Sequence, residues 1–304
     1  MDKKLLTIAI PTYNRASKLD YSLSLFEKEL KSVDESSLVF FISDNCSPDN
    51  TGEIVNKYTE KGMPIIYSRN EENIGPDNNF LKCFYHAQSK YLWLLGDDDY
   101  LLEGKLKMIL NILSSNDIGC LNLKNSQNCP NGIYKYTDNQ KFLMRVGHFM
   151  TFMSANIIRT ESVRATKIDD FLRHSNLLQM PFFIDSSLRF SINILIKDEV
   201  FEKDNNDNNG GYNFFKVFVK NYLKIWKSYR DKNLINWFTY WTIKRRLLWN
   251  FVMPFISYFY IQHRYPNMDK KDGLSLFFKH YWYELYTYVY FFKIPYILYK
   301  TKHF

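Results

Sequence analysis

Residues 91–104 read YLWLLGDDDYLLEG and place three consecutive aspartates (97–99) directly behind an apolar run. The run at 91–95 is typical of a buried strand. Because adjacent carboxylates repel one another and are costly to bury without partners, we expect this strand to leave the core and end at a polar edge. Hard divalent cations bind carboxylate and phosphate oxygens together, so the turn is a candidate cation site. In the alternative interpretation, Asp99 or Glu103 stabilises the N-terminus of the next helix.

Three earlier apolar runs also end in polar residues. LLTIAIP leads into TYNR, SLVFFIS into DNCSPD, and PIIYS into RNEENIGPDNN, with helical patterns between them such as Ser17 to Leu30. Strands that alternate with helices of about 10–15 residues indicate βαβ units and a mostly parallel sheet. Right-handed crossovers place the carboxyl ends of these strands on one edge, where open α/β sheets bind ligands. We therefore expect four polar strand ends to meet in one crevice.

The later part of the chain has a different composition. Residues 117–195 show a less regular pattern, with strand-like DIGCLNL and FMTFMSANIIR, and the polar segment 203–213 is the predicted linker. Residues 1–209 hold 24 Lys and Arg against 28 Asp and Glu, whereas residues 210–304 hold 16 against 4 and carry 31 of the 54 aromatic residues. The chain is therefore predicted to have two chemically different parts.

Composition also narrows the class of protein. A hydrophobic content of 46% with both signs of charge indicates a globular chain of 304 residues. The cysteines show neither a metal-binding nor a disulfide spacing: Cys46, Cys83, Cys120 and Cys129. The apolar stretch before Pro11 is too short for a signal peptide, so a reducing, cytoplasmic environment is expected.

The signatures TIAIPTYNR, ISDNCSPDNT, NIGPDNN and WLLGDDDYL occur in this order, and over about residues 5–200 the chain resembles the inverting family-2 glycosyltransferases. The stretch NNGGYNFFKVFVKNY is more similar to the subgroup that acts on bacterial surface polysaccharides, including abequosyltransferase-like O-antigen enzymes. The resemblance implies an α/β GT-A domain (Rossmann-like, residues 1–209) with a mostly parallel central sheet, followed by an aromatic-rich helical region (210–304). It also implies an enzyme that uses Mn²⁺ or Mg²⁺ and transfers a sugar from a nucleotide-sugar donor.

The resemblance assigns donor-side roles to residues of the four signatures. The metal and diphosphate motif falls on Asp97 and Asp99; if extended geometry continues through the turn, these two face one way and Asp98 the other. Asp44 takes the position of the residue that hydrogen-bonds the base or ribose, and Asn45 stands where a second aspartate is more usual. The residues implied in binding the nucleotide and the donor sugar are Pro11, Thr12, Tyr13, Arg15, Asp44, Asn45, Asn73, Gly75, Asn79, Asp97 and Asp98.

An inverting transfer needs a general base that removes the proton of the acceptor hydroxyl. The family usually has a later acidic motif for this role, and KIDDFLRHSNLLQMPFFID shows no clear match to it. The candidates are Asp169, Asp170, His174 and Asp185, and a neutral histidine is a reasonable base near neutral pH. Asp170 is the nearest chemical equivalent, because it belongs to an acidic pair upstream of a helix. Gln179 is a candidate for the acceptor pocket.

The aromatic and basic C-terminal region is compatible with a membrane surface. Its longest nearly uncharged run, Leu247–Ile261, contains Pro254 and is shorter than the roughly 20 apolar residues of a membrane-spanning helix. Tyr, Trp, Lys and Arg together favour interfacial helices on the anionic inner leaflet, where a lipid-linked oligosaccharide acceptor is anchored. The alternatives are an aromatic helical subdomain and a homo-oligomer interface. No nucleic-acid partner is expected, because the basic clusters are short and lack a known motif.

Two other functions compete with a glycosyltransferase. A nucleotidyltransferase would also use carboxylates and a metal, but PTYNRASK lacks the Gly-rich basic loop that such an enzyme needs near its first strand. A non-catalytic membrane scaffold with a degenerate GT-A domain is compatible with Asn45 and with the unmatched base motif. For the leading interpretation, the expected location is the inner face of the bacterial cytoplasmic membrane, as a peripheral protein.

Overall fold

The chain divides into two compact units, residues 1–205 and 206–304. The computed structural model describes residues 4–125, 132–202, 211–261 and 269–291. Most of the predicted linker lies outside the described residues, and so does Cys129. The described cysteines are free thiols: Cys46, Cys83 and Cys120.

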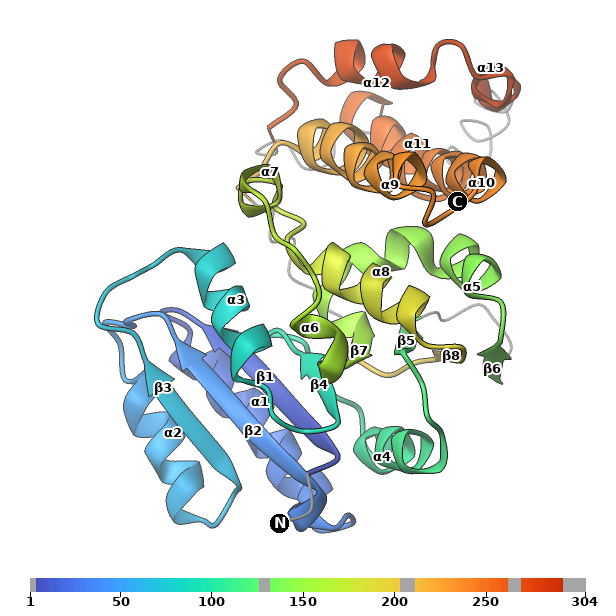
Figure 1. Ribbon diagram of the computed structural model, residues 1–304. Helices are drawn as coiled ribbons and strands as arrows, with labels where there is room; N and C mark the ends of the chain where they lie inside the picture. The colour runs from blue at the N-terminus through green and yellow to red at the C-terminus, as the bar shows by residue number, and fades with distance from the viewer. Residues whose placement is uncertain (1–3, 126–131, 203–210, 262–268, 292–304) are drawn as a thin grey trace, which may run out of the picture. The chain divides into compact units, whose positions relative to one another are not determined.

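The first unit is built, in its described part, on one eight-stranded sheet with the order β3-β2-β1-β4-β7-β5-β8-β6 (Figure 1). Six strands run parallel to one another, while β6 and β7 run antiparallel to their neighbours. The predicted α/β fold with a mostly parallel central sheet is therefore confirmed. The strands are β1 (Leu6–Thr12), β2 (Leu38–Asp44), β3 (Ile65–Arg69), β4 (Tyr91–Leu94), β5 (Cys120–Asn125), β6 (Gly132–Tyr136), β7 (Asn156–Arg159) and β8 (Asn193–Asp198).

Helices cover both faces of this sheet (Figure 1). Leu6, Ile8 and Ile10 alternate along β1 and are fully buried in a core with side chains of α1, α2 and α4, where each contributes about 1.5–3 kcal/mol. On the other face, Phe84 of α3 stacks on Phe182 of α8 with ring centroids 3.9 Å apart. The helices are α1 (Ala16–Leu30), α2 (Thr51–Glu60), α3 (Pro76–His86), α4 (Lys105–Ser115), α5 (Asn139–Val146), α6 (Thr160–Val163), α7 (Asp170–Arg173) and α8 (Gln179–Arg189).

The strand register brings the polar strand ends to one level. Thr12 pairs with Asp44 across β1 and β2, and Asp44 pairs with Arg69 across β2 and β3. On the other side of β1, the N–H of Leu95 donates to the carbonyl of Ala9, so the chain leaves β4 beside the end of β1. The four carboxyl ends therefore share one edge, as the sequence predicts.

The middle of the chain departs from the sequence-based expectation. FMTFMSANIIR predicts one strand, yet only Asn156–Arg159 forms β7, and 3₁₀ turns at Gly147–Thr151 and Met153–Ala155 precede it. The turns are closed locally, because the carbonyl of Phe152 accepts from the N–H of Ala155 and from the amide of Asn156. Strands β6 and β8 lie in a region whose pattern did not predict them.

The second unit is helical and aromatic in its described part, as the resemblance implies (Figure 1). Its core contains a phenylalanine cluster in which Phe214 lies 4.5 Å from Phe255 and 5.3 Å from Phe259 between ring centroids. Among the helices of the described residues, none combines the length and the apolar character that a membrane span requires. The helices are α9 (Tyr222–Asp231), α10 (Trp237–Leu247), α11 (Met253–Ile256), α12 (Gly273–Tyr281) and α13 (Leu285–Phe291), with π-helical segments Lys216–Asn221, Leu248–Val252 and Ser257–Ile261.

Candidate active site

A cavity of about 350 Å³ lies at the shared edge of the strands. Its walls come from the segments that follow β1, β2, β3 and β4, together with Met153 from the turn before β7. Phe80 and Pro76 of α3 also line it. The sequence patterns did not mark Met153, Phe80 or Pro76 as site residues. The predicted donor-side residues that line it are Pro11, Thr12, Tyr13, Arg15, Asn45, Asn73, Asn79, Asp97 and Asp98.

Asp97 is the most buried aspartate of the acidic turn, with 3% of its surface exposed. Its carboxylate accepts from the hydroxyl of Thr12 at 2.7 Å and from Nη1 of Arg15 at 2.9 Å, so β1 and the loop after it hold the side chain. Burial raises the pKa of Asp97 above its usual value, and the bonds from Thr12 and Arg15 lower it in part. The carboxylate is thus ionised at a cost, as a group held ready for a cationic ligand would be.

Asp98 does not point away from Asp97. The chain turns at these two residues instead of staying extended, and Nη1 of Arg15 bridges their carboxylates at 2.9 and 3.0 Å. Lys18, one turn further along α1, also pairs with Asp98 at 2.9 Å. The expectation that Asp97 and Asp99 face one way and Asp98 the other is therefore wrong, because it assumed strand geometry beyond Leu95.

Asp99 contacts a part of the chain that the sequence does not connect to it. Its carboxylate accepts from the hydroxyl of Ser154, whose oxygen in turn accepts from the N–H of Gly96 at 2.8 Å. A Cβ atom on Gly96 would lie only 2.5 Å from a carboxylate oxygen of Asp99. Glycine at this position therefore gives the aspartate turn the space to fold back on itself.

The acidic turn does not cap the helix that follows it. Helix α4 begins at Lys105, and the N–H groups of Gly104 and Leu106 donate to the carboxylate of Glu29 at 2.7 and 3.0 Å. Glu29 belongs to α1 and is 5% exposed, so this cap comes from a distant part of the chain. Glu29 thus provides the hydrogen-bonded cap of α4, and the alternative that the charge of Asp99 or Glu103 favours this helix end stays a prediction.

The aspartate turn offers carboxylate oxygens, which are the ligands that a hard divalent cation prefers. In the described part of the chain, no group of three or more His, Cys, Asp or Glu side chains could hold a metal by itself. A cation bound by Asp97 and Asp99 would accordingly take its other ligands from a substrate diphosphate and water, which is how Mg²⁺ is commonly bound. Arg15 and Lys18 balance the charge of the turn on the cavity side.

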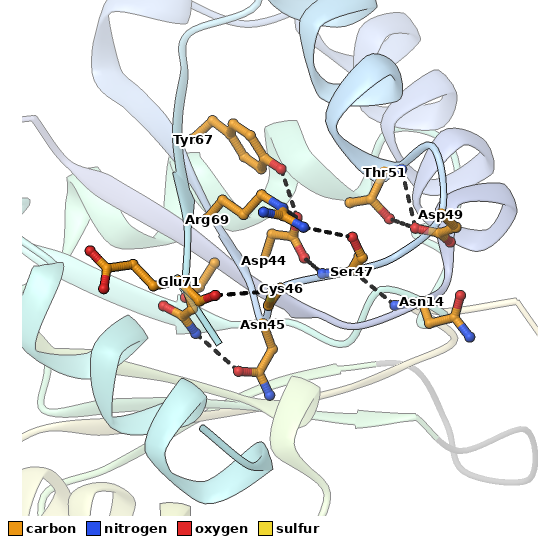
Figure 2. Close-up of polar contacts among 12 residues, drawn as sticks. Asn14, Asp44, Asn45, Cys46, Ser47, Asp49, Thr51, Tyr67, Arg69 and Glu71 are labelled. Atoms are coloured by element: carbon orange, nitrogen blue, oxygen red, sulfur yellow. Dashed lines mark hydrogen bonds and ion pairs between the residues drawn. The ribbon is translucent and has the colours of Figure 1, made fainter. Parts of the chain in front are cut away.

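Asp44 lies at the end of β2 with 1% of its side chain exposed, among the polar contacts drawn in Figure 2. It is not one of the residues that line the cavity. It accepts from the hydroxyl of Tyr67 at 2.7 Å and from the N–H of Ser47 at 2.8 Å, and Nε of Arg69 lies 3.6 Å away. Burial and the bond to Asp44 raise the pKa of Tyr67 far above its usual value. Tyr67 therefore stays a neutral donor, and the role of Asp44 toward a nucleotide stays a prediction.

Asn45 holds the loop that follows β3. Its Oδ1 accepts from the N–H of Ile74 and from the amide of Asn70, both at 3.0 Å, while its Nδ2 donates to Oδ1 of Asn73 at 2.7 Å. The same Asn73 oxygen accepts from the N–H of Gly75, which has a φ of +81° that favours glycine. The amide at position 45 makes this donation to Asn73, which a carboxylate in the same place could not make.

We expect Asn45→Asp to weaken donor binding. The new carboxylate would face Oδ1 of Asn73 without a proton to share, and the lost hydrogen bond would cost about 1–3 kcal/mol. Donor KM should rise more than kcat falls, because the change disorders the wall and leaves the aspartate turn intact. Steady-state kinetics and amide exchange of Ile74 measure this, with exposed Asn56→Asp as the control. An unchanged KM with unchanged Ile74 protection would contradict it.

The general-base candidates separate in space. Asp170 begins α7 and His174 directly follows it; both are exposed, and Nδ1 of His174 lies 3.6 Å from the Asp170 carboxylate. Helix α7 is linked to the start of α3 because Nη1 of Arg173 donates to Oδ1 of Asn78 at 3.2 Å. Asp169 instead caps α7 by accepting from the N–H of Leu172.

Gln179 is the first residue of α8, and Asp185 lies near the middle of the same helix. Asp185 precedes Ser186, whose hydroxyl donates to the carbonyl of Gly119 at the amino end of β5. That end belongs to the sheet edge opposite the aspartate turn. None of Asp170, His174 and Asp185 lines the cavity. Gln179 donates to the carbonyl of Thr151 at 2.9 Å and so supports the segment that carries Met153.

Comparisons with known proteins agree with this geometry. The chain is 38% identical over 113 residues to abequosyltransferase RfbV of Salmonella typhimurium. The matched segment covers 36% of this chain and 33% of that protein. The GalNAc(5)-diNAcBac-PP-undecaprenol beta-1,3-glucosyltransferase of Campylobacter jejuni is 28% identical over 106 residues, covering 34% of this chain and 33% of that protein. The chain thus spans about a third of the length of these two curated relatives.

The fold is shared with a solved transferase. The structure of Staphylococcus aureus TarS residues 1–349 in complex with UDP-GlcNAc superposes with a TM-score of 0.60 at 17% identity, covering 89% of this chain and 75% of that one. The sequence profile described as glycosyl transferase family 2 matches residues 7–167, which include β1 to β4 and the aspartate turn. The chain therefore belongs to glycosyl transferase family 2 and has a GT-A fold.

Proposed function

We propose that the enzyme transfers a sugar from a nucleotide-sugar donor to a glycan acceptor of a bacterial surface polysaccharide, with inversion at the anomeric carbon. The observation that carries this proposal is the aspartate turn, which Thr12 and Arg15 hold in the cavity at the shared strand edge. The names of the Salmonella and Campylobacter relatives, an abequosyltransferase and a glucosyltransferase with an undecaprenol-linked substrate, support the polysaccharide context. The UDP-GlcNAc complex of TarS supports a nucleotide-sugar donor.

In the proposed reaction, the acceptor oxygen forms a bond to the anomeric carbon from the face opposite the diphosphate. The carbon–oxygen bond to the diphosphate breaks, its electron pair leaves with the nucleoside diphosphate, and the acceptor proton passes to a general base. Arg15 and Lys18 supply positive charge beside the turn for the leaving diphosphate. Mn²⁺ or Mg²⁺ held by Asp97 and Asp99 would neutralise the same charge.

For the base, we propose the Asp170 and His174 pair on α7. The pair is supported by its link to α3, whose first turn lines the cavity, while Asp185 lies toward the opposite edge of the sheet. The electrostatic influence of His174 also reaches Asp77 in the first turn of α3, where it lowers a carboxyl pKa that burial has raised. Gln179 is proposed to shape the acceptor side through the segment that carries Met153.

We further propose that the acceptor is lipid-linked and that the enzyme works as a peripheral protein at the inner leaflet. Large side chains on the second unit support a surface contact, since Trp237 is 63%, Trp282 60% and Leu285 84% exposed. Aromatic residues of this kind favour the headgroup level of a bilayer, although a homo-oligomer contact would cover them equally well. Full-length chain that sediments with anionic vesicles no better than alone would count against membrane binding.

The transferase proposal is tested with a panel of UDP-, GDP-, CDP- and dTDP-sugars and a lipid-extract acceptor. We expect one donor class to release nucleoside diphosphate in the presence of Mn²⁺ or Mg²⁺ and to lose most of this release in EDTA. Product anomeric configuration, read by NMR, tests inversion. Release from none of the donors, with or without acceptor, would refute the proposal.

A further inference from the structure

The second unit contains its own cavity, of about 570 Å³, between the π-helical segment at 216–221, α9, α10 and the segment 279–284. Six of its thirteen lining residues are lysines or arginines, and one is a carboxylate, Glu284. Aromatic rings of Tyr240, Trp241 and Tyr283 form part of the wall. This concentration of positive charge is separate from the aspartate turn, which belongs to the first unit.

The single lining carboxylate is already used. Glu284 pairs with Lys244 at 2.5 Å, and Lys244 is almost fully buried, with its ammonium also 2.9 Å from the hydroxyl of Tyr283. Arg230 pairs with Asp231 at 2.7 Å and lies over the ring of Tyr240. These contacts pair two of the cations, Lys244 and Arg230, with carboxylates of the protein.

Three lysines face the cavity without such a balance. Lys220, Lys227 and Lys279 are exposed, and no carboxylate of the described residues lies within ion-pair distance of them. Burial lowers the pKa of His280, and the charges of Lys244, Lys279 and Lys220 lower it further. The charges of these lysines therefore act on His280 in the same direction as its burial. Like charges gathered in this way are stabilised when an anion binds among them.

We infer that this cavity binds a phosphate or diphosphate group, held by the ammonium groups of Lys220, Lys227 and Lys279. Lysine ammoniums act as point charges that suit the tetrahedral oxygens of a phosphate, whereas planar carboxylate recognition favours arginine. The aromatic wall provides an apolar surface for whatever carries the phosphate. That group belongs either to a phospholipid or to the diphosphate of a lipid-linked acceptor, and only the second source rests on the proposed function.

The test measures the binding of inorganic pyrophosphate to the whole chain by isothermal titration calorimetry, in a buffer that contains EDTA. We expect the triple variant Lys220→Gln, Lys227→Gln, Lys279→Gln to bind pyrophosphate at least about tenfold more weakly than the unsubstituted chain. The matched control is Lys216→Gln, Lys232→Gln, Lys271→Gln, which removes the same charge from exposed lysines of the same unit outside the cavity. Equal weakening in both triple variants, or no binding by the unsubstituted chain, would overturn the inference.

A second measurement identifies the source of the phosphate. Loss of binding to phosphatidylglycerol vesicles by the cavity variant, but not by the control, supports a phospholipid headgroup. Retained vesicle binding together with lost pyrophosphate binding supports the acceptor diphosphate. Donor hydrolysis in the first unit is measured on the same samples, and we expect both triple variants to retain it. A failure of the cavity inference is thereby distinguished from a failure of the transferase proposal.

Discussion

Asp97→Asn should abolish sugar transfer while the protein remains as stable as the unsubstituted chain at neutral pH, or becomes more stable. The carboxylate is nearly fully buried at the cavity, so its charge loses solvation energy when the protein folds without a ligand. We expect the charge to act on the ligands of the site instead. Asparagine keeps the shape and the bond from Thr12 but removes the charge. We expect kcat/KM to fall by about 10²–10³ or more, as for other preorganised electrostatic groups.

The sign of the pH dependence follows from the direction of the pKa shift. Burial raises the folded-state pKa of Asp97 above the unfolded value of 3.8. The contribution of this group to stability is therefore full below the unfolded pKa and is lost as the pH rises through the folded pKa. Asparagine does not titrate, so Asp97→Asn removes that loss. As the pH rises from acidic to neutral, the free energy of unfolding of the variant should therefore increase relative to that of the unsubstituted chain.

Urea unfolding at several pH values and nucleoside diphosphate release together measure this prediction. Asp20→Asn is the control, because Asp20 is a half-exposed carboxylate of α1 paired with Lys57. The hydrogen bond from Lys57 outweighs burial at Asp20 and lowers the pKa of this carboxyl group. The effect of Asp20→Asn on the free energy of unfolding should therefore change with pH in the opposite direction. Turnover that survives Asp97→Asn would remove the aspartate turn from the mechanism.

The parts of the site that the sequence predicts are those encoded locally. A strand ending in polar residues is visible in a few consecutive letters, and parallel βαβ units bring such ends to one edge whatever the loop details are. The position of Asp97 beside the end of β1, and of Asn45 in the same cavity, could therefore be predicted without a structure. The fold class could be predicted for the same reason, since alternation of strands and helices spans the first 115 residues.

The remaining contacts depend on long-range packing. Lys18 reaches Asp98 across 80 residues, and Ser154 reaches Asp99 across 55, from a segment whose pattern indicates a strand. Lys18 could have been found from its spacing of one helical turn after Arg15. Ser154 had no local signal, because a short polar residue within FMTFMSANIIR is equally compatible with a solvent-facing strand position. The orientation of Asp98 was predicted wrongly for a related reason, since strand geometry was extended into a turn.

The second large effect is on stability, at Glu29. Glu29→Ala removes both oxygens that accept from the N–H groups of Gly104 and Leu106, where α4 begins. The buried N–H of Leu106 left without a partner costs about 1–3 kcal/mol, whereas the exposed Gly104 can turn to water. The negative charge that favours a helix N-terminus is lost as well. Helix α4 contributes Leu106, Ile109 and other residues to the core under β1 and β4, so its detachment would weaken the sheet that carries the aspartate turn.

Urea denaturation of the full chain, with hydrogen exchange at Gly104 and Leu106, distinguishes this cap from an ordinary surface charge. Glu27→Ala is the matched control on the same helix, because Glu27 makes an exposed pair with Lys61 that is worth about 0–1 kcal/mol. Glu29→Gln retains one acceptor oxygen and should fall between the two. If Glu29→Ala were no more destabilising than Glu27→Ala, the order of α4 would have to come from core packing alone. The helix end would then be capped by water, and the carboxylate of Glu29 would be dispensable to the fold that supports the site.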